Sequence, residues 1–339
     1  RITFTKRPEQ GNWAGLQFRN TQTESRLVYV NMDYSDAGFC AILADHARVT
    51  MEHVIWGNHS RQYLTFDDSS IVLRNSILPD LQDGELVHFS GMPSDGYALF
   101  EGNWFGTTTG YNDIIDLTGG QRPGPIARFL NNTFTGGSDD CIDLDGADAH
   151  VEGNIFMHVH GNPSASSQSH AVTTGTENGQ SSQVTVVRNL FYDVDHALLA
   201  RDGGFIIAVN NTVVHATHAA VNLYEGGAGQ WQGKGFYGDG NIFYDVAHVF
   251  ENPDWAGHPS TITMNNSIFP VIEGDPVVWT GYGNIEDADP QFVNATSPFN
   301  LRTDLRLLPS SAAVGSGPNG RDMGGIVPAG ASIAGEPFP

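Results

Sequence analysis

Short runs in which apolar and polar residues alternate, each ending in glycine, recur along the middle of the chain. Three of them read Glu85-Leu-Val-His-Phe-Ser-Gly, Asp113-Ile-Ile-Asp-Leu-Thr-Gly and Asp140-Cys-Ile-Asp-Leu-Asp-Gly, and a fourth begins at Ala219. Alternation with a period of two is typical of strands that have one buried face. Longer stretches with helical periodicity are almost absent. The pattern therefore predicts an all-β protein built from short strands.

A second phrase, an asparagine followed by a pair that includes a β-branched or aromatic residue, lies between these runs. It begins at Asn75, Asn103, Asn132, Asn154, Asn189, Asn211, Asn241 and Asn266, and counting back by 22 residues reaches His53 and Asn31. The interval is 22 residues four times, and the longer intervals correspond to the same unit with a loop added. Coils of about 22 residues, stacked about 4.8 Å apart, form a parallel β-helix. We expect the asparagines to stack inside it as a ladder that hydrogen-bonds turn backbone in neighbouring coils.

With this repeat over roughly residues 10–290, the sequence resembles the right-handed parallel β-helix superfamily, which includes pectate-lyase-like and polygalacturonase-like proteins. The resemblance implies a single-domain solenoid over residues 1–310. The segment that begins Asp304-Leu-Arg-Leu-Leu-Pro is similar to the closing strand of such solenoids. We expect residues 311–339 to form an extended tail that runs back along the outside and caps an open end. The superfamily hosts lyases, hydrolases, epimerases and adhesins, so the fold alone assigns no activity.

Aligning the alternating runs by their final glycine places acidic residues of successive coils in columns on one outer face. The alignment pairs Asn112 with Asp139, Asp113 with Asp140, Asp116 with Asp143 and Thr118 with Asp145, with His88 one coil before Asp116. Later coils are expected to bring Arg201, Asn222 and Tyr224 onto the same face.

Such a stack of carboxylates has two chemical uses. Carboxylates on adjacent coils lie about 5 Å apart, where like charges oppose joint ionisation. Either one carboxyl keeps its proton and becomes a general acid, or a hard cation such as Ca²⁺ binds. In the first case no cofactor is required. In the second, we expect Asn112 and Asp145 to be ligands together with Asp116 and Asp143.

The run Ser138-Asp-Asp-Cys-Ile-Asp resembles the Asp-Asp-Cys-Ile element of polygalacturonase-type glycoside hydrolases. In that family an Asn-Thr-Asp precedes the element and a Gly-His-Gly follows it, each by about one coil. Here Asn112-Asp113 and His160-Gly161 stand at comparable distances. The resemblance implies that Asp113, Asp139 and Asp140 are the catalytic carboxylates and that His160 orients them.

Further candidates come from loops and columns beside the acidic residues. Residues 161–170 form the longest insertion, a polar loop that would wall a groove, and loops that interrupt a regular scaffold commonly carry function. Sugar rings pack on aromatic side chains, and guanidinium groups bind their substituents. The expected catalytic set is Asp113, Asp116, Asp139, Asp140, Asp143, His160 and Arg201. The expected substrate-binding set is His88, Tyr111, Arg122, His158, His170, His196, Asn222 and Tyr224.

Charge and composition limit the classes of molecule that the protein can bind. The chain has 339 residues, with 16 Lys and Arg against 38 Asp and Glu, a formal charge of −22. This balance excludes a nucleic acid or an anionic membrane surface as the partner. No apolar run is long enough to span a bilayer, and no leader opens the sequence, so we expect a secreted monomer whose signal peptide is absent. Two cysteines, Cys40 and Cys141, are paired or buried as free thiols, and we favour free thiols.

Three functions fit these features. Paired Asp carboxylates favour a glycoside hydrolase acting on a polysaccharide. The first alternative is a Ca²⁺-dependent polysaccharide lyase, which would eliminate across a uronate with Arg201 as the base. The second is a non-catalytic carbohydrate-binding solenoid. Phosphate-binding, dinucleotide-binding, zinc-protease and serine-hydrolase motifs are all absent from the sequence.

Overall fold

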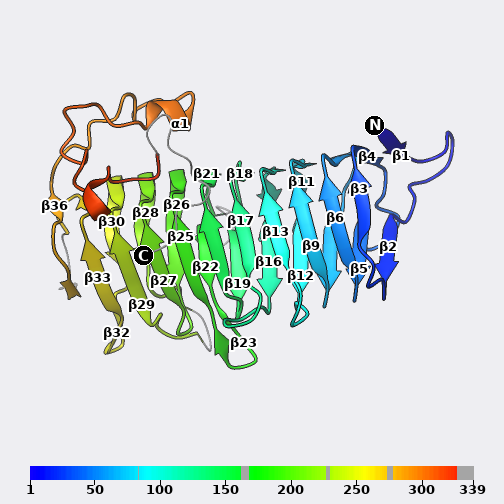
Figure 1. The fold of residues 1–339 in the computed structure, drawn as a ribbon, viewed down its shortest axis with the longest axis horizontal. Helices are drawn as coiled ribbons and strands as arrows, with labels where there is room; N and C mark the ends of the chain where they lie inside the picture. The colour runs from blue at the N-terminus through cyan, green and yellow to red at the C-terminus, as the bar shows by residue number, and fades with distance from the viewer. Residues whose placement is uncertain (83, 162–167, 227–229, 273–277, 327–339) are drawn as a thin grey trace.

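The computed structural model of the protein describes residues 1–82, 84–161, 168–226, 230–272 and 278–326. Its strands form a right-handed parallel β-helix of about 10 turns, averaging about 26 residues each. Successive coils lie side by side along the long axis, from blue to yellow in Figure 1. The predicted fold is confirmed. Coils of 22 residues persist where loops are short, as in the pairing of Arg48 with Ser70, and longer loops raise the average.

Each coil contributes a strand to each of three faces. The first face holds β2 (Leu16–Arg19), β5 (Ile42–Asp45), β8 (Leu64–Asp67), β12 (Val87–Ser90), β16 (Ile115–Thr118), β19 (Asp140–Asp145) and β22 (His170–Thr174). The second face holds β3 (Ser25–Val28), β6 (Arg48–Glu52), β9 (Ser70–Arg74), β13 (Ala98–Glu101), β17 (Ala127–Leu130), β20 (Ala149–Glu152), β25 (Gln183–Val187), β27 (Phe205–Val209), β29 (Gly235–Asp239), β33 (Thr261–Asn265) and β35 (Trp279–Thr280).

The third face joins the first towards the C-terminus. It holds β1 (Ile2–Phe4), β4 (Val30–Asp33), β7 (Ile55–Gly57), β10 (Ile77–Leu78), β14 (Trp104–Phe105), β18 (Thr133–Phe134) and β21 (Ile155–Val159), and later β34 (Ile268–Phe269) and β36 (Ile285–Glu286). Between them, three long strands span both faces: β26 (Leu190–Ala200), β28 (Thr212–Asn222) and β30 (Ile242–Glu251).

Short elements lie outside the three faces. They are the parallel pair β11 (Leu81–Gln82) and β15 (Thr108–Thr109), the hairpins β23 (Thr176–Glu177) with β24 (Gln180–Ser181) and β31 (Asp254–Trp255) with β32 (His258–Pro259), the helix α1 (Leu301–Asp304) and a 3₁₀ turn at Pro318–Gly320. In the described part of the chain, no helix has the length and apolar character needed to cross a membrane.

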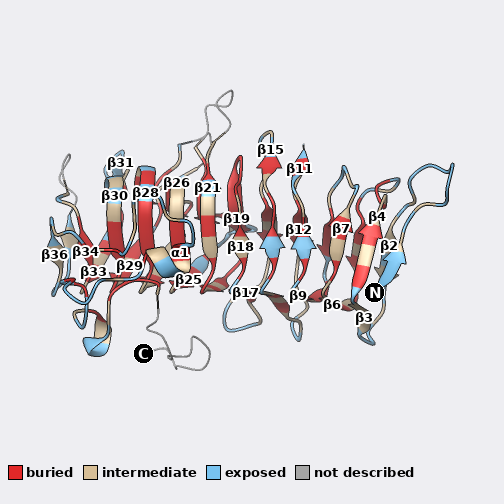
Figure 2. Cartoon of the chain, turned by 90° about the horizontal axis from the view of Figure 1, so that it is seen from above, coloured by how far each residue is buried: buried red, intermediate tan, exposed pale blue. Residues whose placement is uncertain are grey.

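The interior consists of stacked apolar side chains, which Figure 2 shows as buried strands along the whole solenoid. The rings of Phe105, Phe134, Phe156 and Phe191 stack with centroids 4.7 to 4.9 Å apart. At this position residues one coil apart are therefore of the same type. Cys40 and Cys141 are free and buried, as we favoured.

The predicted asparagine ladder exists, but the anchors at both of its ends differ from the prediction. Asn103, Asn132, Asn154, Asn189, Asn211 and Asn241 are buried, and each side chain accepts the backbone N–H of the preceding ladder member or of its equivalent. Towards the ends the ladder positions are Ser76 and Ser267, not Asn75 and Asn266, which lie outside it in the left-handed region. Asn284, which the prediction did not include, continues the ladder by accepting the backbone N–H of Ser267. A slip of one residue reverses the direction of a side chain, so His53 and Asn31 are outside the ladder as well.

The C-terminal segment packs along the side of the solenoid. Leu301, Leu305 and Met323 bury against Leu190, Val214 and Ile242 of the third face, and the Arg302 guanidinium donates to the carbonyl of Gly153 at 2.7 Å. The described part of this segment thus lies over a lateral face, and the tail expected over residues 311–339 stays a prediction. The division at residue 310 stays a prediction, and residues 327–339 of the expected cap lie outside the described residues.

Candidate functional site

The acidic columns expected from the sequence are present on the first face. Asp116 pairs with Asp143 and Thr118 with Asp145 between β16 and β19, while His88 of β12 pairs with Asp116. The alternating residues Ile115 and Ile142 are fully buried. Because side chains alternate across a strand, their burial turns the aspartates to the outer side.

Three carboxyl groups converge on one point. One oxygen each of Asp113, Asp140 and Asp143 lies within 4.8 Å of the others, and Asp140 and Asp143 are 3% and 9% exposed. We call these three residues the acidic trio. The loop before β16 brings Asp113 into it, because the Asp140 backbone N–H donates to Asp113 Oδ1 at 3.0 Å. The trio is a compact set of hard oxygen donors.

The charges of the trio are only partly balanced. Burial, and then the neighbouring carboxylates, hold the pKa of Asp113 well above its ordinary value. Burial also raises the pKa of Asp143, although Arg201 Nη2 lies 3.2 Å from it. Burial acts in the same direction on Asp140, but the charge and hydrogen bond of His170 outweigh it and lower its pKa. At neutral pH the trio therefore needs protons or a cation.

Ca²⁺ fits this donor set. It prefers six to eight oxygen ligands, including carboxylates, and it compensates charges that a buried site cannot hold alone. Only Asp143 of the four expected ligands belongs to the trio. Asn112 Nδ2 donates to the carbonyl of Thr109, and Asp145 lies 3.8 Å from Arg201. Asp116 belongs to a neighbouring group with Glu85 and His88, whose ligand atoms also lie within 4.8 Å of one another. The three residues therefore lie outside the trio, and their expected role as ligands stays a prediction.

Asp139 lies next to the trio and has a different character. Burial, and then Asp140 and Glu225, raise its pKa to about 8. Tyr111 is close enough for Asp139 to raise its pKa further, after burial, to about 12, and the Tyr111 side chain is exposed. A carboxyl group that titrates near neutral pH suits proton transfer.

Arg201 follows β26 and is held by acidic residues on several sides. Its guanidinium contacts Asp143, Asp145 and Glu225. Burial favours the neutral form, but these carboxylates outweigh it and raise the pKa of Arg201 above its ordinary value. A raised pKa disfavours the neutral form that a base requires, and the expected role of Arg201 as a base stays a prediction. Its ion pairs hold Asp143 and Glu225 in position.

His170, not His160, is the histidine that contacts the expected carboxylates. His170 Nδ1 lies 2.9 Å from Asp140 Oδ1, and both side chains are buried. His160 Nδ1 lies 2.9 Å from Asp195 and its Nε2 3.1 Å from Asp193. The insertion after β21 separates the two histidines, so one continues the third face and the other begins the first. The role expected for His160 is therefore wrong.

Of the remaining candidates, two lie on the first face and two lie away from the trio. His158 pairs with Asp193 beside His160, and Arg122 pairs with Asp148 and donates to the carbonyl of Gln183 near the second face, so both are away from the trio. Asn222 and Tyr224 do follow the acidic columns. Asn222 is buried and bonds Asn252, while Tyr224 stacks on Trp255 with centroids 4.6 Å apart. These contacts extend the first face towards the C-terminus.

His196 continues the row of histidines from His170. The two rings stack with centroids 4.7 Å apart, and His196 Nε2 lies 2.7 Å from Glu251 Oε2. Burial is the main reason why the pKa of His196 falls to about 4.

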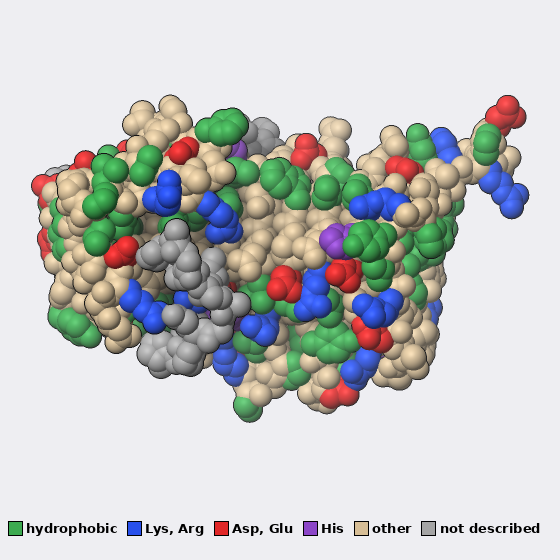
Figure 3. Space-filling view, turned by 45° about the horizontal axis from the view of Figure 1, so that its top comes forward, with side chains coloured by type: hydrophobic (Ala, Val, Ile, Leu, Met, Phe, Trp, Pro, Cys, Tyr) green, Lys and Arg blue, Asp and Glu red, His purple; other side chains and the backbone are tan. Residues whose placement is uncertain are grey.

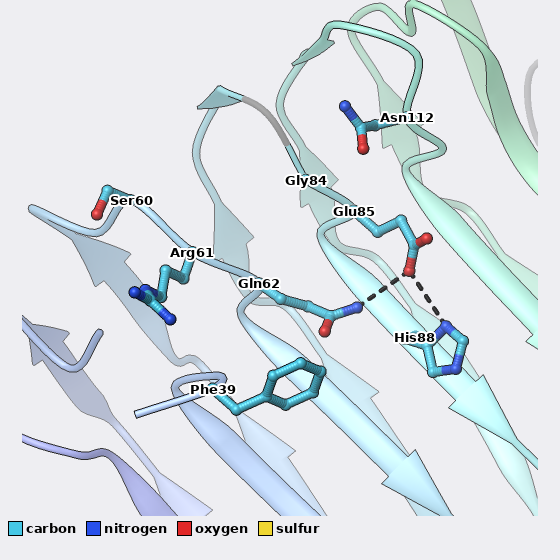
Figure 4. A pocket seen from close by; sticks show the side chains of 8 residues that line it. All are labelled: Phe39, Ser60, Arg61, Gln62, Gly84, Glu85, His88 and Asn112. Carbon is cyan, nitrogen blue, oxygen red and sulfur yellow. Dashed lines mark hydrogen bonds and ion pairs between the residues drawn. The ribbon is translucent and has the colours of Figure 1, made fainter. Parts of the chain in front are cut away.

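A cavity opens on the N-terminal side of the trio. It has a volume of about 610 Å³ and is lined by Phe39, Ser60, Arg61, Gln62, Gly84, Glu85, His88 and Asn112. Figure 4 shows Gln62 and His88 meeting at the Glu85 carboxylate. Sequence reasoning named only His88 and Asn112 of this lining. Phe39, 70% exposed, and Arg61 lie in earlier coils, which contribute none of the acidic residues expected at the site.

His88 gives a pH prediction. Its hydrogen bonds to Asp116 and then Glu85 raise its pKa to about 10 from an ordinary 6.5. A histidine whose folded pKa is raised stabilises the fold fully below its unfolded pKa, and this contribution is lost as pH rises through the folded value. We expect His88→Gln to lower the free energy of unfolding by about 1 kcal/mol at pH 6, because water screens this partly exposed group. Urea unfolding of both proteins should show the difference disappearing above about pH 10. A difference that grows with pH would contradict this assignment.

Comparisons with known proteins add a structural relative. No protein-family model matches the chain, and no curated protein matches it. The crystal structure of pectate lyase Pel9A is similar in structure, with a TM-score of 0.47 and 13% sequence identity over 96% of this chain and 85% of that chain.

Proposed function

We propose that this protein is an enzyme that cleaves a uronate-containing polysaccharide by β-elimination, with Ca²⁺ bound at the acidic trio. The observation that carries the proposal is the convergence of Asp113, Asp140 and Asp143 on one point. A glycosidase needs two carboxyl groups on either side of the glycosidic bond, with the sugar between them. Buried carboxylates that face one another at less than 5 Å leave room for an ion but not for a sugar ring.

The substrate class follows from charge. A chain with a formal charge of −22 repels polyanions unless cations intervene, and a cation in the trio would supply that attraction locally. On the face seen in Figure 3, basic and acidic side chains are interspersed. In the cavity beside the trio, Arg61 offers a second positive charge to an acidic sugar, and Phe39 offers an apolar surface.

The residues of the site have different roles in the proposed elimination. Bound Ca²⁺ would neutralise the uronate carboxylate and make the adjacent C–H more acidic. Asp139, when ionised, takes that proton; the C–H electron pair forms the double bond as the bond to the next sugar oxygen breaks, and that oxygen receives a proton from water. Arg201 holds Asp143 in place, and His170 holds Asp140.

One observation favours the alternative of glycoside hydrolysis. Asp139, with a pKa of about 8, is protonated at neutral pH, as a general acid must be. Asp139 is thus the proton-transfer residue in both chemistries. Action outside the cell stays a prediction in either case.

The product distinguishes the two reactions. We expect incubation with polygalacturonate or alginate to produce the ultraviolet absorbance of an unsaturated uronate, and EDTA to abolish it. Neutral polysaccharides should remain intact. Reducing ends without absorbance, insensitive to EDTA, would establish hydrolysis instead. Binding without any cleavage would support a carbohydrate-binding solenoid.

A further inference from the structure

A second group of metal-ligating side chains lies along the first face, beyond the acidic trio. His196 of β26, His218 of β28 and Glu251 of β30 come from three successive coils. Each offers one ligand atom, and these atoms lie within 4.8 Å of one another. The His196 ring stacks on His170 on one side and on His218 on the other, with centroids 4.7 and 5.2 Å apart. Because His170 contacts Asp140, only the His170 ring separates this group from the acidic trio.

His218 lies in a β-bulge of β28. Between Val194 and His196 the strand β26 advances by two residues, while the paired residues of β28, Ala216 and Ala219, are three apart. The same extra residue appears against β30. The register therefore pairs His196 with Ala219, and His218 is the residue directly before Ala219, in the bulge, where its ring still stacks on His196. Bulges of this kind redirect a side chain, and here the redirected side chain is an imidazole.

The surroundings support a ligand for these nitrogens. His196 is fully buried, and its Nε2 lies 2.7 Å from Glu251 Oε2, so this ring nitrogen faces the group. His218 Nδ1 lies 3.2 Å from the Gln168 amide, an outer contact of the kind that fixes the ring orientation of metal-bound histidines. His218 and Glu251 are half-buried, so a coordination position stays open to solvent.

We propose that His196, His218 and Glu251 form a site for a borderline divalent transition-metal ion of the Zn²⁺ class, separate from the Ca²⁺ site. Imidazole nitrogen suits zinc, copper, nickel and iron, whereas Ca²⁺ requires oxygen donors. Two histidines and one glutamate with an open position are the ligand set of catalytic zinc sites. The site takes an oxygen ligand from solvent or from a sugar in the groove. It does not depend on the proposed lyase activity.

Titration calorimetry of the full chain, stripped of metal and then saturated with Ca²⁺, tests the proposal with Zn²⁺ as the probe. We expect one equivalent to bind, and His218→Ala and Glu251→Gln each to weaken binding at least tenfold. Co²⁺ should give a visible ligand-field band that both variants lose. Glu251→Gln keeps the size of the side chain, so it remains informative if His218→Ala unfolds.

Two control variants separate this site from its neighbours. His215→Ala removes an exposed histidine of the same strand, which pairs with Asp245, and should leave Zn²⁺ binding unchanged. Asp113→Asn should leave it unchanged as well, while it removes Ca²⁺ binding. Zinc affinity that survives both His218→Ala and Glu251→Gln, or that Asp113→Asn abolishes, would overturn the proposal.

Discussion

Asp113→Asn is expected to make the Ca²⁺-free protein more stable and at the same time to abolish activity. Asn keeps the oxygen that accepts the Asp140 backbone N–H, so the loop before β16 should keep its position. The substitution removes one of three carboxylates that repel one another in a buried site. We expect Ca²⁺ to stop raising the melting temperature and cleavage to fall on the order of a thousandfold, since charge stabilisation at the reacting centre is lost.

The pH dependence of the stability gain has a definite sign. The pKa of Asp113 is raised above 3.8 in the folded protein, so ionisation there opposes folding. The gain of Asp113→Asn over the native chain should be absent well below pH 3.8 and should grow as pH rises above it. Thermal unfolding with EDTA across pH 3 to 8 measures it. Asp67→Asn, an exposed aspartate of the same face, is the matched control and should change neither property. A destabilised Asp113→Asn that still responds to Ca²⁺ would contradict the assignment.

Asn154→Ala is expected to destabilise the solenoid by about 4 kcal/mol, because it leaves buried polar groups without partners. Asn154 Oδ1 accepts the backbone N–H and the side-chain amide of Asn132, and its Nδ2 donates to the carbonyl of Phe129 and to Asn189. All of these bonds lie in the fully buried ladder, where water cannot replace them. Urea unfolding followed by circular dichroism measures the loss.

The matched control is Asn154→Ser. Serine already occupies two equivalent positions of the ladder, since Ser76 and Ser267 each accept a backbone N–H at 3.0 Å. Asn154→Ser keeps an acceptor for the Asn132 backbone and should lose about half as much stability as Asn154→Ala. Equal losses for the two variants would show that the volume of the side chain, and not its hydrogen bonds, determines the effect.

The sequence was sufficient to predict the register of the first face because it has a period of two and a fixed end. Each run closes with a glycine, so Asp116 and Asp143 could be aligned without knowledge of the loops. The ladder ends were misplaced by one residue because serine replaces asparagine there while an asparagine stands directly before it. The local sequence pattern cannot show which of two adjacent small polar residues, the asparagine or the serine after it, points into the ladder.

Which side chains belong to the site was harder to predict where a loop or a bulge interrupts the regular strands. His160 and His170 are separated by an insertion that moves them to different faces, so distance along the chain chose the wrong histidine. Arg201 was correctly placed on the acidic face, but its set of three carboxylate partners, Glu225 among them, is a tertiary feature. His218 lies in a bulge of β28, where counting by a period of two fails, so only the strand pairing shows its place.

A crystal structure of the protein grown with Ca²⁺, with anomalous data collected at long wavelength, tests the central claim most directly. We predict an anomalous peak bound by oxygens of Asp113, Asp140 and Asp143, which would disappear in crystals of Asp113→Asn. Well-ordered electron density in which these side chains bond only one another, without a peak at saturating Ca²⁺, would contradict it.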